Sequence, residues 1–229
     1  MPLTKTEISD PPFHGIIYGH PGAGKTTFGV KLASHLTDKS IGLLDYENSS
    51  DAIRGTGLED RVDVYKNIDE IKKWQNVKSA VSGKEHGAWI IDSATSMSDR
   101  LLMEIMKKSR NDKPLFDEWN ELTYQMKEIF YACIDSGQHL ILVSHQKLWR
   151  DEDDGRVKEI RPGMTPAAQE AAEKVFSEVL YLELKTGPKG SERTLYVESQ
   201  GKILAKNRRS AWTENKYTEP NIKEMFNVS

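Results

Sequence analysis

Residues Gly19 to Thr26, with the sequence GHPGAGKT, constrain the fold of this chain more than any other stretch. They match the phosphate-binding loop pattern G-x-x-x-x-G-K-[ST] at every defined position. Glycines let the backbone turn its N–H groups inward, the lysine can reach β- and γ-phosphates, and the neighbouring hydroxyl suits Mg²⁺. The pattern needs a strand before it and a helix after it, so it predicts an α/β fold.

The flanking sequences supply both elements. Residues 14–18 form a short apolar run typical of a buried strand. After the loop, Phe28, Leu32 and Leu36 recur at helical spacing and give one apolar helix face. We therefore predict that the loop binds the phosphates of a nucleotide through Gly19, His20, Pro21, Gly22, Ala23, Gly24, Lys25, Thr26 and Thr27.

Two further apolar runs end in acidic residues. The run 40–45 ends at Asp45 and leads directly to Glu47, and the run 88–93 contains Asp92. In parallel sheets a ligand binds outside the carboxyl ends of the strands. We predict that Asp92 and Thr26 position Mg²⁺, in the manner of a Walker B strand. Glu47 is a candidate to activate water beside the γ-phosphate, and a solvated loop carboxylate explains its position equally well.

The remaining sequence alternates between strand and helix patterns. We expect strands at 62–65 and 139–146, helices at 68–81, 95–110, 117–135 and 166–175, and β-runs at 178–184, 194–199 and 203–206. Together with the segments around the phosphate-binding loop, these strands and helices predict a mostly parallel α/β sheet with helices on both faces and a C-terminal antiparallel β extension. We expect one domain, with a loose lead-in at 1–12, a core at 13–208 and a tail at 209–229.

Residues 147–165 are predicted to be a long polar loop, and such loops are usually functional or disordered. Up to Gly163 the segment carries five basic and five acidic side chains, so it is not simply a basic clamp. Trp149, flanked by Lys147 and Arg150, is a candidate to stack a nucleic-acid base, or it packs back on the core.

Composition sets limits on the partners. The net charge of −3 gives no global attraction for nucleic acid, so such binding would need a local patch. The single cysteine, Cys133, is compatible with a reducing cytosol and is expected to be a small core residue. The sequence has no apolar run of membrane-spanning length, and its polar start does not resemble a signal peptide. We expect a cytoplasmic protein without a membrane partner.

Taken in order, these motifs resemble a RecA-like P-loop ATPase core over about Phe13 to Arg208. The motifs are the loop Gly19–Thr26, the acidic strand end Leu43–Glu47, the strand end Ile90–Ser93, the strand end Val143–Gln146, and the late β-run ending Lys206–Arg208. The chain is similar in particular to phage-encoded AAA/RecA-like nucleotide-binding proteins of the single-strand annealing and recombination type.

This resemblance implies ATP and Mg²⁺ as cofactors, single-stranded DNA as a partner and hydrolysis stimulated by DNA. From position alone, a Gln or His at the polar end of the strand 139–146 can sense the γ-phosphate by hydrogen bonding, or it is only a capping residue. The resemblance implies that Lys25 and the base Glu47 are catalytic and that Gln146 is a switch between the nucleotide and the following loop. Lys147, Trp149 and Arg150 would lie in the segment that touches DNA. A homo-oligomer, ring or filament, and a single-strand binding or annealing protein are the implied protein partners, in a bacterial host cell if the chain is phage-encoded.

The basic cluster Lys206–Arg209 has three interpretations, namely a solvated face, a phosphate contact, or cations donated to the nucleotide of a neighbouring subunit. The resemblance favours the last for Lys206 and Arg208. Two other functions remain open for the chain as a whole. One is a P-loop kinase of a small molecule, with the segment 147–165 as an arginine-bearing lid. The other is a nucleotide-gated adaptor or loader that hydrolyses slowly.

Overall fold

The structure is a computed structural model that describes residues 11–109, 111–188, 190–209, 212 and 214–225. Residues 1–10 of the predicted lead-in, and parts of the predicted tail, lie outside the described residues. The elements are, in chain order, β1 His14–Gly19, α1 Lys25–Leu36, β2 Ile41–Asp45, η1 Ser50–Ile53, η2 Glu59–Arg61, β3 Val62–Tyr65, α2 Ile68–Ile71, α3 Trp74–Ser82, β4 Ala88–Asp92, α4 Ala94–Met106, α5 Phe116–Ser136, β5 His139–Arg150, β6 Val157–Pro162, α6 Pro166–Val175, β7 Glu178–Gly187, β8 Gly190–Tyr196, β9 Lys216–Thr218 and α7 Ile222–Met225.

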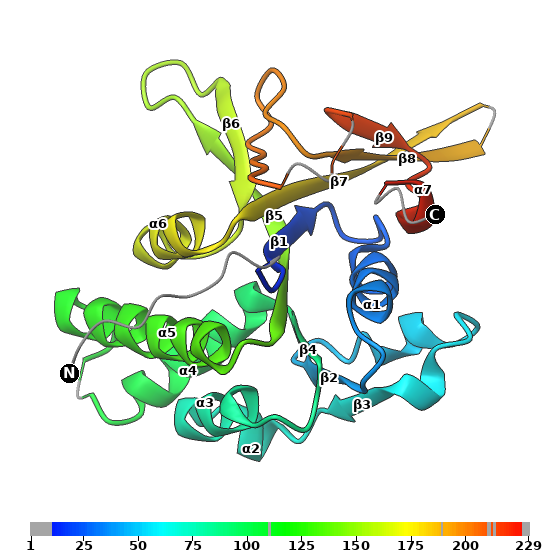
Figure 1. The fold of residues 1–229 in the computed structure, drawn as a ribbon. Helices are drawn as coiled ribbons and strands as arrows, with labels where there is room; N and C mark the ends of the chain where they lie inside the picture. The colour runs from blue at the N-terminus through cyan, green and yellow to red at the C-terminus, as the bar shows by residue number, and fades with distance from the viewer. Residues whose placement is uncertain (1–10, 110, 189, 210–211, 213, 226–229) are drawn as a thin grey trace, which may run out of the picture.

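A single sheet organises the molecule (Figure 1). Its strand order is β3-β2-β4-β5-β1-β7-β8-β9, and the first six of these strands are parallel. Strands β8 and β9 add to the β7 edge in antiparallel fashion. The predicted fold class is therefore confirmed. Because β1 lies between β5 and β7, the loop that follows β1 emerges near the middle of the carboxyl edge of the sheet.

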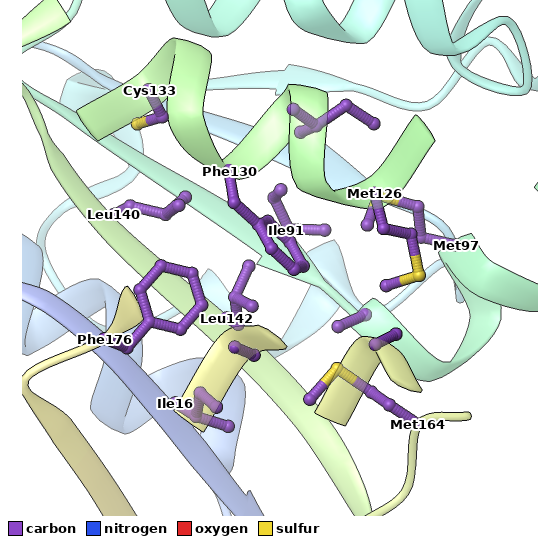
Figure 2. Close-up of a cluster of buried hydrophobic side chains, with 14 of the residues drawn as sticks. Ile16, Ile91, Met97, Met126, Phe130, Cys133, Leu140, Leu142, Met164 and Phe176 are labelled. Carbon is purple, nitrogen blue, oxygen red and sulfur yellow. The ribbon is translucent and has the colours of Figure 1, made fainter. Parts of the chain in front are cut away.

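Helices cover both faces of the sheet (Figure 1). Helices α3, α4, α5 and α6 pack on one face, in a cluster that includes Met97, Phe130 and Phe176 (Figure 2). Helices α1 and α7 cover the other face with residues such as Val30 and Met225. Central strands are buried on both sides, which is why they read as continuous apolar runs. No helix in the described part of the chain is long and apolar enough to cross a membrane.

The prediction that Cys133 is a small core residue is confirmed. The side chain is fully buried in the cluster of Figure 2, on α5. Burial raises the pKa of its thiol to about 12, which keeps it protonated at neutral pH. A thiol in this state is inert, so Cys133 acts as a small apolar side chain.

The predicted helix 68–81 is wrong in one respect, because it is two helices. Helix α2 ends at Ile71, and Lys73 is extended where α3 begins. The hydroxyl of Tyr46, which is buried, donates a hydrogen bond of 2.7 Å to the carbonyl of Ile71. A helix end in the core needs such a partner for its carbonyl groups, and periodicity alone does not reveal one.

The predicted loop 147–165 is also wrong, since most of it is a β-hairpin. Strand β5 runs on to Arg150 and pairs antiparallel with β6, from Gln146 opposite Pro162 onward. Figure 1 shows this hairpin projecting from the body of the molecule. The hydroxyl of Tyr18 on β1 lies 2.6 Å from the carbonyl oxygen of Leu204 and 2.9 Å from that of Ile160, and its single proton anchors the β6 side of the hairpin at this point.

The C-terminal third departs from prediction at two places. Residues 203–206 form only isolated bridges, such as Val179 with Lys206, rather than a strand. The predicted tail contains β9 and α7, whose Ile222 and Met225 are buried against the α1 face. Elements this short carry too few residues for a periodic pattern, and their packing against the body of the domain stabilises them.

We predict that Tyr46→Phe lowers the free energy of unfolding by about 1–3 kcal/mol, because the buried carbonyl of Ile71 loses its partner. Urea denaturation measures the difference. Tyr131→Phe is the matched control, since Tyr131 is exposed and should change stability by less than about 0.5 kcal/mol. Equal effects of the two substitutions would show that the Tyr46 hydrogen bond does not stabilise the fold.

Candidate active site

The loop between β1 and α1 has the form of an anion cradle. Gly22 and Gly24 have positive φ angles of 81° and 92°, which favour glycine. Gly24 is the N-cap of α1 and, as a glycine, has no side chain to cap this helix start. The N–H groups of the first turn are therefore left for an anion, and the helix dipole adds to the attraction.

Lys25 is the cation of this cradle. Its side chain is only 7% exposed, and its Nζ donates to the carbonyl of His20 at 3.0 Å. Burial lowers the pKa of Lys25, while the nearby Asp92 and Glu47 act in the opposite direction. A buried ammonium group beside free N–H groups is suited to a phosphate, which would replace the water that it has lost.

A cavity of about 350 Å³ opens at this loop. It brings together most of the predicted site residues, and its lining is Pro21, Gly22, Gly24, Lys25, Thr26, Thr27, Glu47, Ser49, Ala52, Asp92 and His145. Three predicted loop residues do not line it. Ala23 is buried, the His20 ring bonds to the neighbouring Pro21 carbonyl, and Gly19 lies beneath β7. A Cβ on Gly19 would stand 2.1 Å from the Leu182 carbonyl oxygen, so this glycine is needed for packing.

Asp92 and Thr26, the predicted Mg²⁺-positioning residues, are in contact. The Thr26 hydroxyl donates to Asp92 Oδ2 at 2.5 Å, and the Ser49 hydroxyl donates to the same oxygen at 2.7 Å. Burial raises the pKa of Asp92; these two hydrogen bonds lower it, and the charges of Glu47 and Asp45 raise it further. A carboxylate in this position would be stabilised by a cation.

The donor set fits Mg²⁺ bound together with a nucleotide. Within the described residues, no group of three or more His, Cys, Asp or Glu side chains is arranged to hold a metal by itself. Mg²⁺ commonly binds through one or two protein oxygens together with phosphate oxygens and water. Thr26 and Asp92 supply such oxygens at the mouth of the phosphate cradle.

Glu47 faces the cradle across the same cavity. Its Oε1 accepts hydrogen bonds from the Ser93 hydroxyl, from the Ser96 hydroxyl at 2.6 Å and from His145 Nε2 at 2.8 Å. Burial alone would raise the pKa of Glu47, but these hydrogen bonds and the His145 ring outweigh it, so the pKa is lowered. The carboxylate is therefore held ionised and in one orientation, as a general base requires.

Of the two polar residues at the end of the buried part of β5, the structure places His145 rather than Gln146 in the cavity. Gln146 Oε1 accepts a hydrogen bond of 2.9 Å from the Tyr181 hydroxyl and does not line the cavity. Successive side chains of a strand point to opposite faces, so only one of the two can face the loop.

The predicted trans-acting cations differ in their surroundings. Lys206 Nζ donates to the carbonyls of Glu173 and, at 2.8 Å, Phe176, so it caps the C-terminal end of α6 within its own chain. Arg208 is exposed. The two residues therefore do not form one exposed pair.

The candidate DNA-contact residues lie on the hairpin. Lys147, Trp149 and Arg150 are exposed, and Trp149 retains 50% of its surface. The Arg161 guanidinium stacks 4.0 Å from the centre of the Trp149 ring. Several hairpin cations are paired with neighbours, as in the contacts of Lys158 with Asp151, Arg156 with Asp154 and Arg161 with Glu159.

Sequence reasoning missed several residues of the site. Ser93 and Ser96 follow β4 at a spacing of three, which places two hydroxyls on one side of a helix start and was a usable signal. Ser49 follows Glu47 by two positions and had no signal of its own. Arg193 on β8 donates from Nε to the Ala23 carbonyl at 3.1 Å, and only the sheet topology brings these residues together.

The fold is RecA-like, and the loop between β1 and α1 matches the phosphate-binding pattern. A family model described as an AAA domain matches residues 12–209, and the chain belongs to this AAA-domain family. No curated protein is similar enough in sequence to count as a relative.

Two solved structures share the fold. The RadB recombinase is 15% identical, with 91% of this chain and 86% of that chain covered and a TM-score of 0.56. A KaiC-like protein from the hyperthermophilic archaeon Pyrococcus horikoshii is 16% identical, with 90% and 84% covered and a TM-score of 0.53. At these identities the likeness shows the fold alone.

Proposed function

We propose that this chain hydrolyses ATP in the presence of Mg²⁺ and acts on single-stranded DNA in recombination or replication of the phage type. The position of Glu47 carries the proposal of hydrolysis. Its Oε1 is occupied by three donors, while Oε2 accepts no hydrogen bond from the described residues. The free oxygen of an ionised carboxylate across the cavity from the phosphate cradle is suited to orient and deprotonate a water molecule.

The other residues of the cavity have complementary roles. The N–H groups at the start of α1 hold phosphate oxygens, and Lys25 neutralises charge at the β- and γ-phosphates. Thr26 and Asp92 would hold Mg²⁺, which when bound withdraws charge from the phosphate oxygens. Hydrogen bonds from Ser93, Ser96 and His145 together lower the pKa of Glu47 and keep it ionised.

The hairpin supports the proposal of a single-stranded partner. Trp149 offers an exposed ring for base stacking, and Lys147 is exposed beside the groove of about 560 Å³ between the hairpin and α6. Because several hairpin cations are already paired with carboxylates, stacking should contribute more than phosphate contacts.

The hairpin is connected through β5 to Glu47, the proposed general base. Strand β5 runs without interruption from His145, which bonds to Glu47, to Arg150 on the hairpin. The far end of the hairpin returns to the same point, since the N–H of Gly163 donates to the His145 carbonyl at 2.6 Å and to the Ser144 hydroxyl at 3.0 Å. A DNA strand bound at the hairpin would thus act on hydrolysis through His145, in the role that the family resemblance implied for Gln146.

We extend the proposal to assembly. The exposed Arg208 is the better candidate to reach the nucleotide of a neighbouring subunit, because Lys206 is bound within its own chain. A homo-oligomer on DNA, assisted by a single-strand binding or annealing protein, would use this cation in trans.

The first test is phosphate release from ATP with Mg²⁺, with and without single-stranded DNA. Glu47→Gln should lower kcat by roughly 10²–10⁴-fold, because the amide cannot accept the proton, while ATP affinity stays within a few-fold. Lys25→Ala is the blank, and Glu85→Gln, an exposed glutamate far from the loop in sequence, is the matched control. Slow turnover that DNA leaves unchanged would favour the adaptor, and a phosphorylated small molecule would favour the kinase.

The pH dependence of hydrolysis provides a second test. Because the pKa of Glu47 is lowered, activity should persist below the usual range of a glutamate and be lost as the pH falls through the lowered value. His145→Ala removes one hydrogen bond and should move this acid limb to higher pH. His145→Gln, which retains a donor, should move it less. An acid limb that is the same in all three proteins would show that Glu47 is not the titrating base.

The third test concerns the hairpin. Trp149→Ala should weaken single-stranded DNA binding by about 1–3 kcal/mol, or roughly 5- to 150-fold, as expected for loss of one stacked base. Fluorescence anisotropy of a labelled oligonucleotide measures the affinity. Tyr131→Ala is the control, because Tyr131 is an exposed aromatic residue on α5 and does not lie on the hairpin. Equal losses in both variants would argue against stacking on Trp149.

A further inference from the structure

We infer that Ser49 is a positioning residue of the Mg²⁺ site and that Asp45, buried beneath the loop, holds it in place. The inference rests on the proposed function, since it assigns residues to the metal of that reaction. Neither residue was predicted to take part in the site, and neither belongs to the phosphate-binding pattern.

Asp45 organises the loop that follows β2. Its side chain is 1% exposed. Oδ1 accepts from the N–H groups of Glu47 at 3.2 Å and Ser49 at 2.9 Å, and Oδ2 accepts from the N–H of Ser50 at 3.0 Å. One carboxylate therefore fixes the backbone of the residues on both sides of Asn48. Hydrogen bonds to a charged acceptor are among the stronger ones, so this loop is pre-organised.

Ser49 connects the loop held by Asp45 to Asp92. Its hydroxyl lies 2.7 Å from Asp92 Oδ2 and 3.2 Å from Asp45 Oδ1. A hydroxyl has one proton, and the shorter distance places the stronger hydrogen bond on Asp92. Thr26 donates to the same oxygen, so Oδ2 is held from two sides while Oδ1 accepts no hydrogen bond from the described residues.

This arrangement orients a carboxylate for a cation. Two hydroxyls hold Oδ2 of Asp92 in place. Oδ1 is therefore left to bind the cation or a water molecule that the cation carries. Asp45, Glu47 and Asp92 also gather negative charge at the ends of β2 and β4, which favours a divalent ion. Partners that orient a metal-binding group typically account for 10- to 100-fold in metal affinity.

The test is the Mg²⁺ dependence of binding of a fluorescent, non-hydrolysable ATP analogue, which does not depend on turnover. We expect Ser49→Ala to raise the Mg²⁺ concentration at half-maximal binding by about 10-fold. Ser49→Thr, which keeps the hydroxyl, should restore most of the wild-type value. Asp45→Asn should raise the midpoint at least as much, and if that variant does not fold, the two Ser49 variants decide the matter.

The outcomes separate the two claims. A midpoint for Ser49→Ala within twofold of wild type, with binding still dependent on Mg²⁺, would overturn the role of Ser49. Wild-type protein that binds Mg²⁺ and the analogue together but never hydrolyses ATP would count against the proposed function alone. Binding that Mg²⁺ does not affect in any variant would overturn the inference directly.

Discussion

The parallel pairing of β1 with β5 and β7 is the constraint on which the site depends. It places the phosphate-binding loop beside the ends of β4 and β5, although Asp92 and His145 lie 67 and 120 residues beyond Lys25 in the numbering. The approach is close enough that no side chain fits at Gly19 beneath Leu182. A shift in this pairing would move the phosphate-binding loop away from the carboxylates of Glu47 and Asp92. The geometry of the site therefore depends on the register of the sheet.

The site also contains several buried charged side chains. Lys25, Asp45 and Asp92 are all less than 10% exposed, and isolated charges in such places are costly. Each is compensated by hydrogen bonds that also fix its direction, such as those of Asp45 to the loop and of Asp92 to two hydroxyls. The energetic requirement to satisfy buried charges and the geometric requirement of the site are therefore met by the same contacts.

The predictions succeeded where a local pattern has a single physical meaning. Apolar runs with flanking turns located β1, β2, β4 and the buried part of β5, and the glycine pattern located the cradle. They failed where tertiary contacts decide. The hairpin after Gln146 is polar and half exposed, so it reads as a loop until β6 pairs with it. At the break after Ile71, the helix carbonyl is satisfied by the hydroxyl of Tyr46, which is distant in sequence.

The sequence by itself determined the α/β class, the phosphate cradle and the acidic strand ends, because these depend on glycine geometry and on periodic burial. Only the tertiary structure decided which polar side chains face the cavity. His145 rather than Gln146 meets Glu47, Lys206 caps its own helix, and Ser49 bonds to Asp92. These choices depend on strand register and on hydrogen bonds between segments far apart in the chain, and no local pattern records them.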